Sequence, residues 1–210
     1  MPRQAGFFGA LWDKGKSLAR RRVTRGVITV ETWEVYNAKG EKTGRIQEEG
    51  RPPREGEFRL CGSLWLLNAK GELLIQQRAQ CKSRAPGKWS VTGGGALAGE
   101  TGLQACLRET KEELGLVFEP GQLSLLLKSV GEGLIFEDYI VRCDLPEQAM
   151  TLQAQEVSQV RWASPQEIRA LFDGGEFIYQ ESELQKVLDY ARESLRESGL
   201  PGGEKAKLPD

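Results

Sequence analysis

The feature that most constrains this chain is a stretch in which acidic, basic and glycine residues stand at fixed intervals. Five residues separate Gly94 from Glu100, and seven more separate Glu100 from the run Arg108-Glu109-Thr110-Lys111-Glu112-Glu113-Leu114-Gly115-Leu116. A glycine run, Gly93-Gly94-Gly95, overlaps its start. Glycine lets a backbone approach an ion or a phosphate closely because it has no side chain. The pattern therefore predicts a loop and a helix that hold a hard cation beside a phosphate chain.

A helix is expected to begin just after Glu100. Thr101 followed by Gln104 is a capping-box pattern, in which each residue satisfies a backbone N–H of the first turn. Gly115 is a suitable end, because glycine readily adopts the left-handed conformation of a helix C-cap.

The acidic residues of this helix fall on one arc. At about 100° per residue, Glu109, Glu112 and Glu113 share one side, and the leucines share another. Like charges three and four residues apart repel each other on a bare helix. A bound cation is the simplest way to stabilise them, and the alternative is a solvated acidic face paired with Lys111 and Arg108.

The available ligand types restrict the cation. The chain contains no histidine, and its four cysteines show no CxxC spacing. Zinc and copper sites, which use such ligands, are therefore poorly supported. Carboxylate oxygens favour Mg²⁺ or Mn²⁺, which also accept phosphate oxygens.

The complete spacing resembles the Nudix box, with Gly94, Glu100 and Gly115 at its structural positions. Thr110 stands where the family usually has an aliphatic residue, and a β-branched side chain of this size can still face the core. The resemblance implies an α+β fold, the Nudix α/β/α sandwich with a mixed sheet. It also implies a Nudix-type pyrophosphohydrolase, which uses a divalent metal to cleave the diphosphate linkage of a nucleoside diphosphate derivative or a similar organic diphosphate.

The resemblance also implies roles for individual residues. Glu112 and Glu113 correspond to the main metal ligands, and Glu109 to a further ligand or to the base that activates water. Arg108 corresponds to an arginine that orients a glutamate of the helix. Glu100 is expected to position the loop.

Further candidates lie outside the helix. The carbonyl of Gly93 resembles a backbone ligand of the family. Glu156, in a segment that resembles a late strand of the family, is our candidate for a fourth carboxylate ligand; the alternative is a loop glutamate without a partner. Arg78 and Lys82 fit the isopentenyl-diphosphate isomerase branch and could contact a diphosphate; the alternative is a solvated strand end and loop.

Isomerase activity is a competing interpretation, because residues 31–37 also resemble the start of that branch. Isomerases carry a cysteine and a histidine shortly after a tryptophan, whereas Trp89 is followed here by Ser90-Val91-Thr92 and the glycines. The complete box therefore favours hydrolysis. A non-catalytic nucleotide-binding module is a third interpretation.

Composition excludes several other classes. The net charge of −1 gives no general nucleic-acid signal, and no apolar run reaches the ~20 residues of a membrane-spanning helix. Scattered cysteines argue against a disulfide framework and predict a cytoplasmic protein. The expected partner is a small-molecule diphosphate, and a homodimer stays open.

We expect three parts: a basic N-terminal extension (1–26), a Nudix domain (27–198, box 94–116) and a flexible tail (199–210). Residues 1–25 carry seven basic side chains and one acidic side chain. Residues 3–25 could touch an anionic membrane surface or nucleic acid, although a docked extension or a loose tail is favoured. Strands are expected at 27–36, 42–47, 60–67, 72–78, 123–130, 134–143 and 156–162, and further helices from residue 164 and at 184–195.

Overall fold

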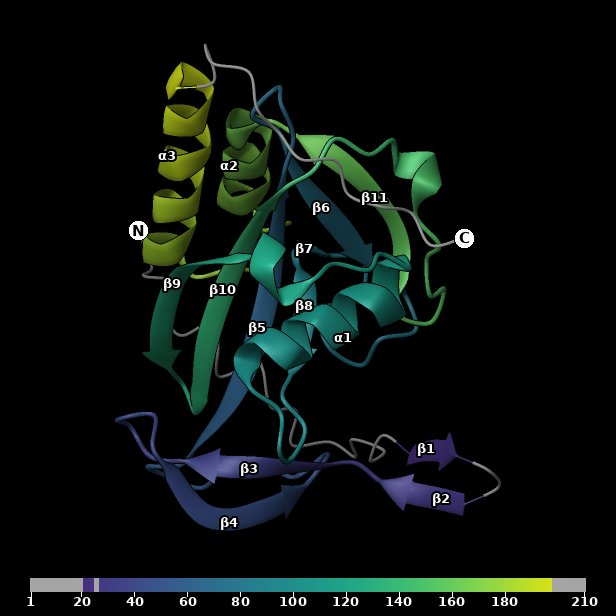
Figure 1. Cartoon of the computed structure of the whole chain (residues 1–210), viewed down its shortest axis with the longest axis vertical. Helices are drawn as coiled ribbons and strands as arrows, with labels where there is room; N and C mark the ends of the chain where they lie inside the picture. Colours follow the sequence, from purple (N-terminus) through teal and green to yellow (C-terminus); the bar gives the residue numbers. More distant parts are fainter. Residues whose placement is uncertain (1–20, 25–26, 198–210) are drawn as a thin grey trace.

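The computed structural model describes residues 21–24 and 27–197 (Figure 1). The predicted tail and most of the predicted extension, including most of its surface-contacting segment, lie outside these residues. The elements in chain order are β1 (Arg21–Thr24), β2 (Val27–Val30), β3 (Thr32–Tyr36), β4 (Lys42–Glu48), β5 (Phe58–Leu67), β6 (Leu73–Arg78), β7 (Trp89–Ser90), β8 (Thr92–Gly95), α1 (Gly102–Leu114), η2 (Pro120–Gln122), β9 (Ser124–Gly131), β10 (Leu134–Arg142), η3 (Glu147–Ala149), β11 (Val157–Ala163), α2 (Pro165–Asp173) and α3 (Glu181–Glu197).

The helix termini follow the predicted signals. The Thr101 side chain caps α1 in a complete capping box with Gln104, and Gly115 ends the helix in the left-handed conformation at φ 71°. Ser164 caps α2 in the same way with Glu167.

One predicted strand is divided. Residues 27–36 form two strands because β2 pairs with β1, which the sequence did not predict, whereas β3 pairs with β4 and β5.

The main sheet is mixed, as predicted. Its central order is β11-β6-β5-β10-β9, with β3 and β8 also paired to β5, β4 to β3, and β7 to β6. The β5–β10 pair is parallel, and the other pairs are antiparallel.

Helices cover both faces of this sheet (Figure 1). On one face α1 packs over a buried cluster that includes Leu64, Leu66, Cys106, Leu114, Tyr139 and Val141. On the other face α2 and α3 pack over Trp65, Leu67, Ile75, Ile140, Ile168, Leu184 and Leu188. Side chains alternate between faces along β5, as in any strand. The expected α/β/α sandwich is therefore confirmed.

Helix α1 lies directly against β5 at Gly62. A Cβ atom at this position would come within 2.0 Å of the backbone oxygen of Gly102 in α1. The missing side chain thus sets the distance between the box helix and the sheet. No helix in the described ranges is long and apolar enough to span a membrane.

A buried carboxyl group on the face of α2 and α3 should make stability depend on pH. Asp138 is 1% exposed, and burial raises its pKa to about 6, although hydrogen bonds from Tyr179 and Ser63 lower it. Because the folded pKa is above the ordinary value, the stabilisation is fully present below about pH 4 and is lost as pH rises through about 6. Asp138→Asn carries no charge at any pH and should escape this loss.

We therefore expect the free energy of unfolding of the wild type, relative to Asp138→Asn, to fall by roughly 2–3 kcal/mol between about pH 4 and pH 7.5. Urea unfolding of both proteins at the two pH values measures this difference. A difference that does not change with pH would contradict the assignment.

Candidate active site

Arg108 is the centre of the hydrogen-bond network on α1. Its Nε and Nη2 donate to the two carboxylate oxygens of Glu100 at 2.8 and 3.0 Å, so these side chains form a bidentate pair. Its Nη1 donates to Glu109 at 2.8 Å and to Glu112 at 3.3 Å. Its Nη2 also donates to the carbonyl of Gly95 at 3.0 Å. One guanidinium group therefore fixes the loop glutamate, two helix glutamates and the glycine strand together.

Glu113 is buried on the inner side of the helix. Its Oε2 accepts hydrogen bonds from Gln76 Nε2 at 2.9 Å, from Thr92 Oγ1 at 2.7 Å and from the Gly93 backbone N–H at 3.3 Å. Burial, followed by the negative charge of Glu109, raises the pKa of Glu113 to about 7, and these hydrogen bonds lower it. A cation nearby would favour the ionised form.

The glycine run forms β8, which is paired with β5 beside the carboxylates. A Cβ on Gly94 would lie 2.4 Å from Oε1 of Glu109. Only glycine fits here without displacing that carboxylate. The sequence predicted the close approach but not that the run would be a strand.

The three helix glutamates differ in exposure, which their shared arc did not predict. Glu109 and Glu113 are buried, whereas the Glu112 side chain is 38% exposed. The sheet covers only part of the arc, and Glu112 lies at its rim. Among the described residues, no three acidic or cysteine side chains converge tightly enough to enclose a metal ion.

The candidates outside the helix gather near its C-terminal end. The backbone N–H of Gln153 donates to the Glu113 carbonyl at 3.0 Å, which docks the loop before β11 on α1. Three residues later, Glu156 forms an ion pair with Lys82. Arg78 stands opposite Val157 in the β6–β11 ladder, and its Nε donates to the carbonyl of Arg84 at 3.1 Å. Glu156 and Lys82, predicted for metal and for diphosphate, are thus partners of one another here.

Sequence reasoning missed the residues that hold Glu113. Gln76 and Thr92 become its partners because β6 and β8 lie under α1. Thr92 stands directly before the glycines, and this position is the one sequence signal that could have suggested its role in holding Glu113.

The donor set fits a hard divalent cation. Every side chain proposed as a metal ligand is a carboxylate. Glu109 and Glu113 are buried, and the negative charge of Glu109 acts on Glu113. Oxygen donors of this kind suit Mg²⁺ or Mn²⁺. The arrangement can therefore hold a cation next to a glycine backbone that admits a phosphate.

Comparison with known proteins agrees with this reading. Residues 58–181 match the NUDIX domain family. An uncharacterised Nudix hydrolase of Listeria monocytogenes is 36% identical over 152 residues, covering 71% of this chain and 89% of that protein. An isopentenyl-diphosphate Delta-isomerase of Escherichia coli is 38% identical over 88 residues, covering 41% of this chain and 48% of that protein.

A crystal structure from Deinococcus radiodurans shares the fold. Its TM-score is 0.61 at 24% sequence identity, and the match covers 78% of this chain and 98% of that one. The family match extends over more than half of the chain and includes the whole box. The chain therefore belongs to the Nudix hydrolase family and is a Nudix-type pyrophosphohydrolase.

Proposed function

We propose that this protein uses a divalent cation, Mg²⁺ or Mn²⁺, to hydrolyse the diphosphate linkage of a nucleoside diphosphate derivative or a similar organic diphosphate. Nudix hydrolases act on pyrophosphate bonds of small molecules, and members of the family generally use a divalent metal. The observation that carries the proposal is the Arg108 network, which holds Glu100, Glu109 and Glu112 beside the glycine strand.

The ligands proposed for the cation are the carboxylates of Glu109, Glu112, Glu113 and Glu156 and the carbonyl of Gly93. When bound, the cation neutralises phosphoryl oxygens and makes a water molecule more acidic. With no histidine in the chain, a glutamate is the natural proton acceptor.

Arg108 fixes the orientation of two of these carboxylates, Glu109 and Glu112. Its contacts with Glu109 and Glu112 keep both on the side of β8. We assign proton transfer to Glu109 or Glu112, which Arg108 holds together on one helix face. Arg78 and Lys82 are the proposed contacts to the rest of the diphosphate, and Lys82 would then exchange its contact with Glu156 for the substrate.

Isoprenoid isomerisation is the second candidate, favoured by the local identity to the Escherichia coli isomerase. The residues after Trp89 are Ser90, Val91 and Thr92, which cannot supply an isomerase's cysteine and histidine. Hydrolysis therefore remains the better supported reaction. A cytoplasmic location and a homodimer stay predictions.

A substrate panel tests the proposal. We expect nucleoside diphosphate derivatives to be cleaved to monophosphates in the presence of Mg²⁺ and to survive when the metal is chelated. Isopentenyl diphosphate is included as the competing substrate, and products are followed by phosphorus NMR. Migration of its double bond without release of phosphate would support isomerisation instead. Binding of nucleotides without any turnover would support the non-catalytic module.

A further inference from the structure

Arg59 approaches the glycine strand from the face opposite α1, and a second arginine, Arg84, is close enough for the two charges to act on each other. Arg59 is the second residue of β5 and stands two residues before Cys61, which pairs with Gly95 of β8. A Cβ on Gly95 would lie 2.3 Å from Cζ of Arg59. The guanidinium group therefore lies directly on the glycine backbone. The carbonyl of Gly95 also accepts a hydrogen bond from Arg108, the centre of the carboxylate network.

Arg84 belongs to the same cluster, although it comes from the loop between β6 and β7. Burial, followed by the charges of Arg78 and Arg59, lowers its pKa to about 10. The charges of Arg59, Arg84 and Glu109 all affect the pKa of the Cys61 thiol. The two guanidinium groups therefore act on each other and on Cys61, whose pKa the charge of Glu109 also affects.

Both arginines bury a hydrogen-bond donor without an acceptor. In the part of the chain that the structure describes, neither the Nε of Arg59 nor the Nε of Arg84 has a hydrogen-bond partner. Burying such a group without an acceptor is unfavourable, so these N–H groups point to a ligand that accepts from them.

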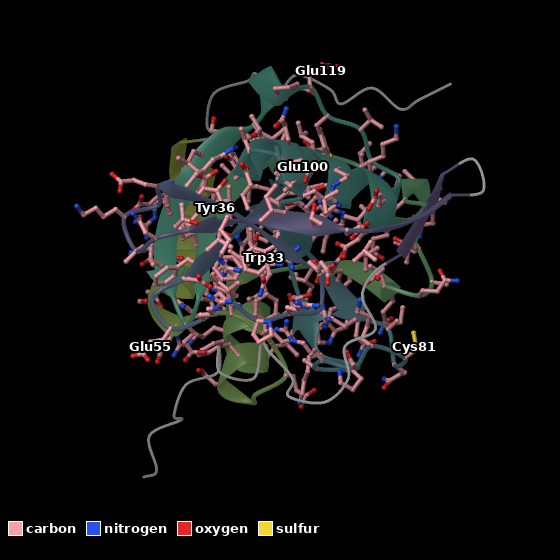
Figure 2. The ribbon with its side chains drawn as sticks, turned by 90° about the horizontal axis from the view of Figure 1, so that it is seen from below. Trp33, Tyr36, Glu55, Cys81, Glu100 and Glu119 are labelled. Atoms are coloured by element: carbon pink, nitrogen blue, oxygen red, sulfur yellow. The ribbon has the colours of Figure 1, made fainter. Side chains whose placement is uncertain are left out.

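The surroundings of Arg59 keep its guanidinium in place. The side chain is 10% exposed, and its Nη2 lies 2.6 Å from a carboxylate oxygen of Glu49. Its Cζ stands 5.5 Å from the ring centroid of Trp33, in a cation–π contact. Trp33 is fully buried and lies near the centre of the view from below (Figure 2). The group is thus held rigidly while its Nε is left for another acceptor.

We propose that Arg59 and Arg84 bind a phosphate group of the substrate on the sheet face opposite the box helix. The fork of a guanidinium group matches the oxygens of a phosphate. Because Gly95 has no side chain, only its backbone separates Arg59 from the Arg108 network, which holds the proposed catalytic carboxylates. The identity of the anion as part of a diphosphate rests on the proposed function. Arg59 and Arg84 are substrate-binding residues in this proposal, and both were absent from the sequence-based candidates.

Binding of inorganic pyrophosphate to the full chain, measured by calorimetry in the presence of a chelator, tests the proposal without turnover. Arg84→Gln should raise the dissociation constant at least about tenfold, the effect of losing one charged hydrogen bond. Arg51→Gln removes the same charge from an arginine whose side chain is 69% exposed, and it should bind like the wild type. If Arg84→Gln does not fold, Arg84→Lys keeps the charge, loses the fork and should also bind more weakly.

Equal affinities for the wild type and Arg84→Gln would overturn the assignment, as would a wild type that does not bind pyrophosphate. Glu112→Gln separates this proposal from the proposed function, because it should lose hydrolysis and keep pyrophosphate binding. With a cleaved substrate from the panel, Arg84→Gln should raise KM at least about tenfold and change kcat much less. A fall in kcat with an unchanged KM would contradict binding as the role of Arg84.

Discussion

Replacing Glu112 with glutamine should lower kcat by about 10²–10⁴-fold at saturating metal, the range that a positioned carboxylate contributes to proton transfer. Glutamine keeps the size of the side chain and removes its charge. The Glu112 side chain is 38% exposed, and its contact with Arg108 is 3.3 Å long. Because exposed ion pairs contribute about 0–1 kcal/mol, the fold should be unaffected.

Steady-state kinetics over a range of Mg²⁺ concentrations measure this effect. Glu55→Gln is the matched control, because Glu55 is exposed and stands at the edge of the molecule, well away from Glu100 and the box (Figure 2). The control should keep the wild-type kcat. Full turnover by Glu112→Gln at saturating metal would refute the role assigned to Glu112.

Adding one methyl group at Gly62 should destabilise the protein by about 3 kcal/mol or more. The new Cβ would meet backbone atoms of α1, at 2.0 Å from the Gly102 oxygen and 3.0 Å from the Cys106 nitrogen. Backbone cannot move aside as a flexible side chain can, so the whole helix must shift from the sheet. That shift would loosen the cluster under α1 and separate Glu113 from Gln76 and Thr92.

Urea unfolding of Gly62→Ala compared with Gly121→Ala tests this expectation. Gly121 has no neighbour within 4 Å of its Cβ position and no positive φ, so its substitution should change stability by less than about 0.5 kcal/mol. Gly62→Ala should also lose activity, because the carboxylates move with the helix. Wild-type stability in Gly62→Ala would show that α1 is not seated on β5 as described.

Local signals were sufficient to predict the box helix and its caps. Thr101, Gln104 and Gly115 act on their own neighbours in sequence, and all three behave as their residue types predict. Because helix geometry is nearly invariant, the angular arc puts Glu109, Glu112 and Glu113 on one side of α1. Their difference in exposure depends on where the sheet ends, which the helix sequence does not encode.

The contacts between distant segments could not be predicted. Gln76 and Thr92 hold Glu113 only because β6 and β8 lie beneath α1. The parallel pairing of β5 with β10 brings together segments 75 residues apart in the chain (Leu134 opposite Arg59). Arg59 and Arg84 carry no motif, and only the folded chain places Arg59 against Gly95 and brings Arg84 near Arg59. The ion pair between Lys82 and Glu156 joins two candidates that the sequence had assigned to different ligands.

The central claim is that the carboxylates of the box support attack of water on a diphosphate. The most direct measurement is cleavage of the best panel substrate in water enriched in oxygen-18, with Mg²⁺ or with a chelator, followed by mass analysis of the products. We predict one heavy oxygen in one of the two phosphoryl products of each turnover, and no cleavage when the metal is chelated. Products without heavy oxygen, or equal cleavage in the chelator, would contradict the account.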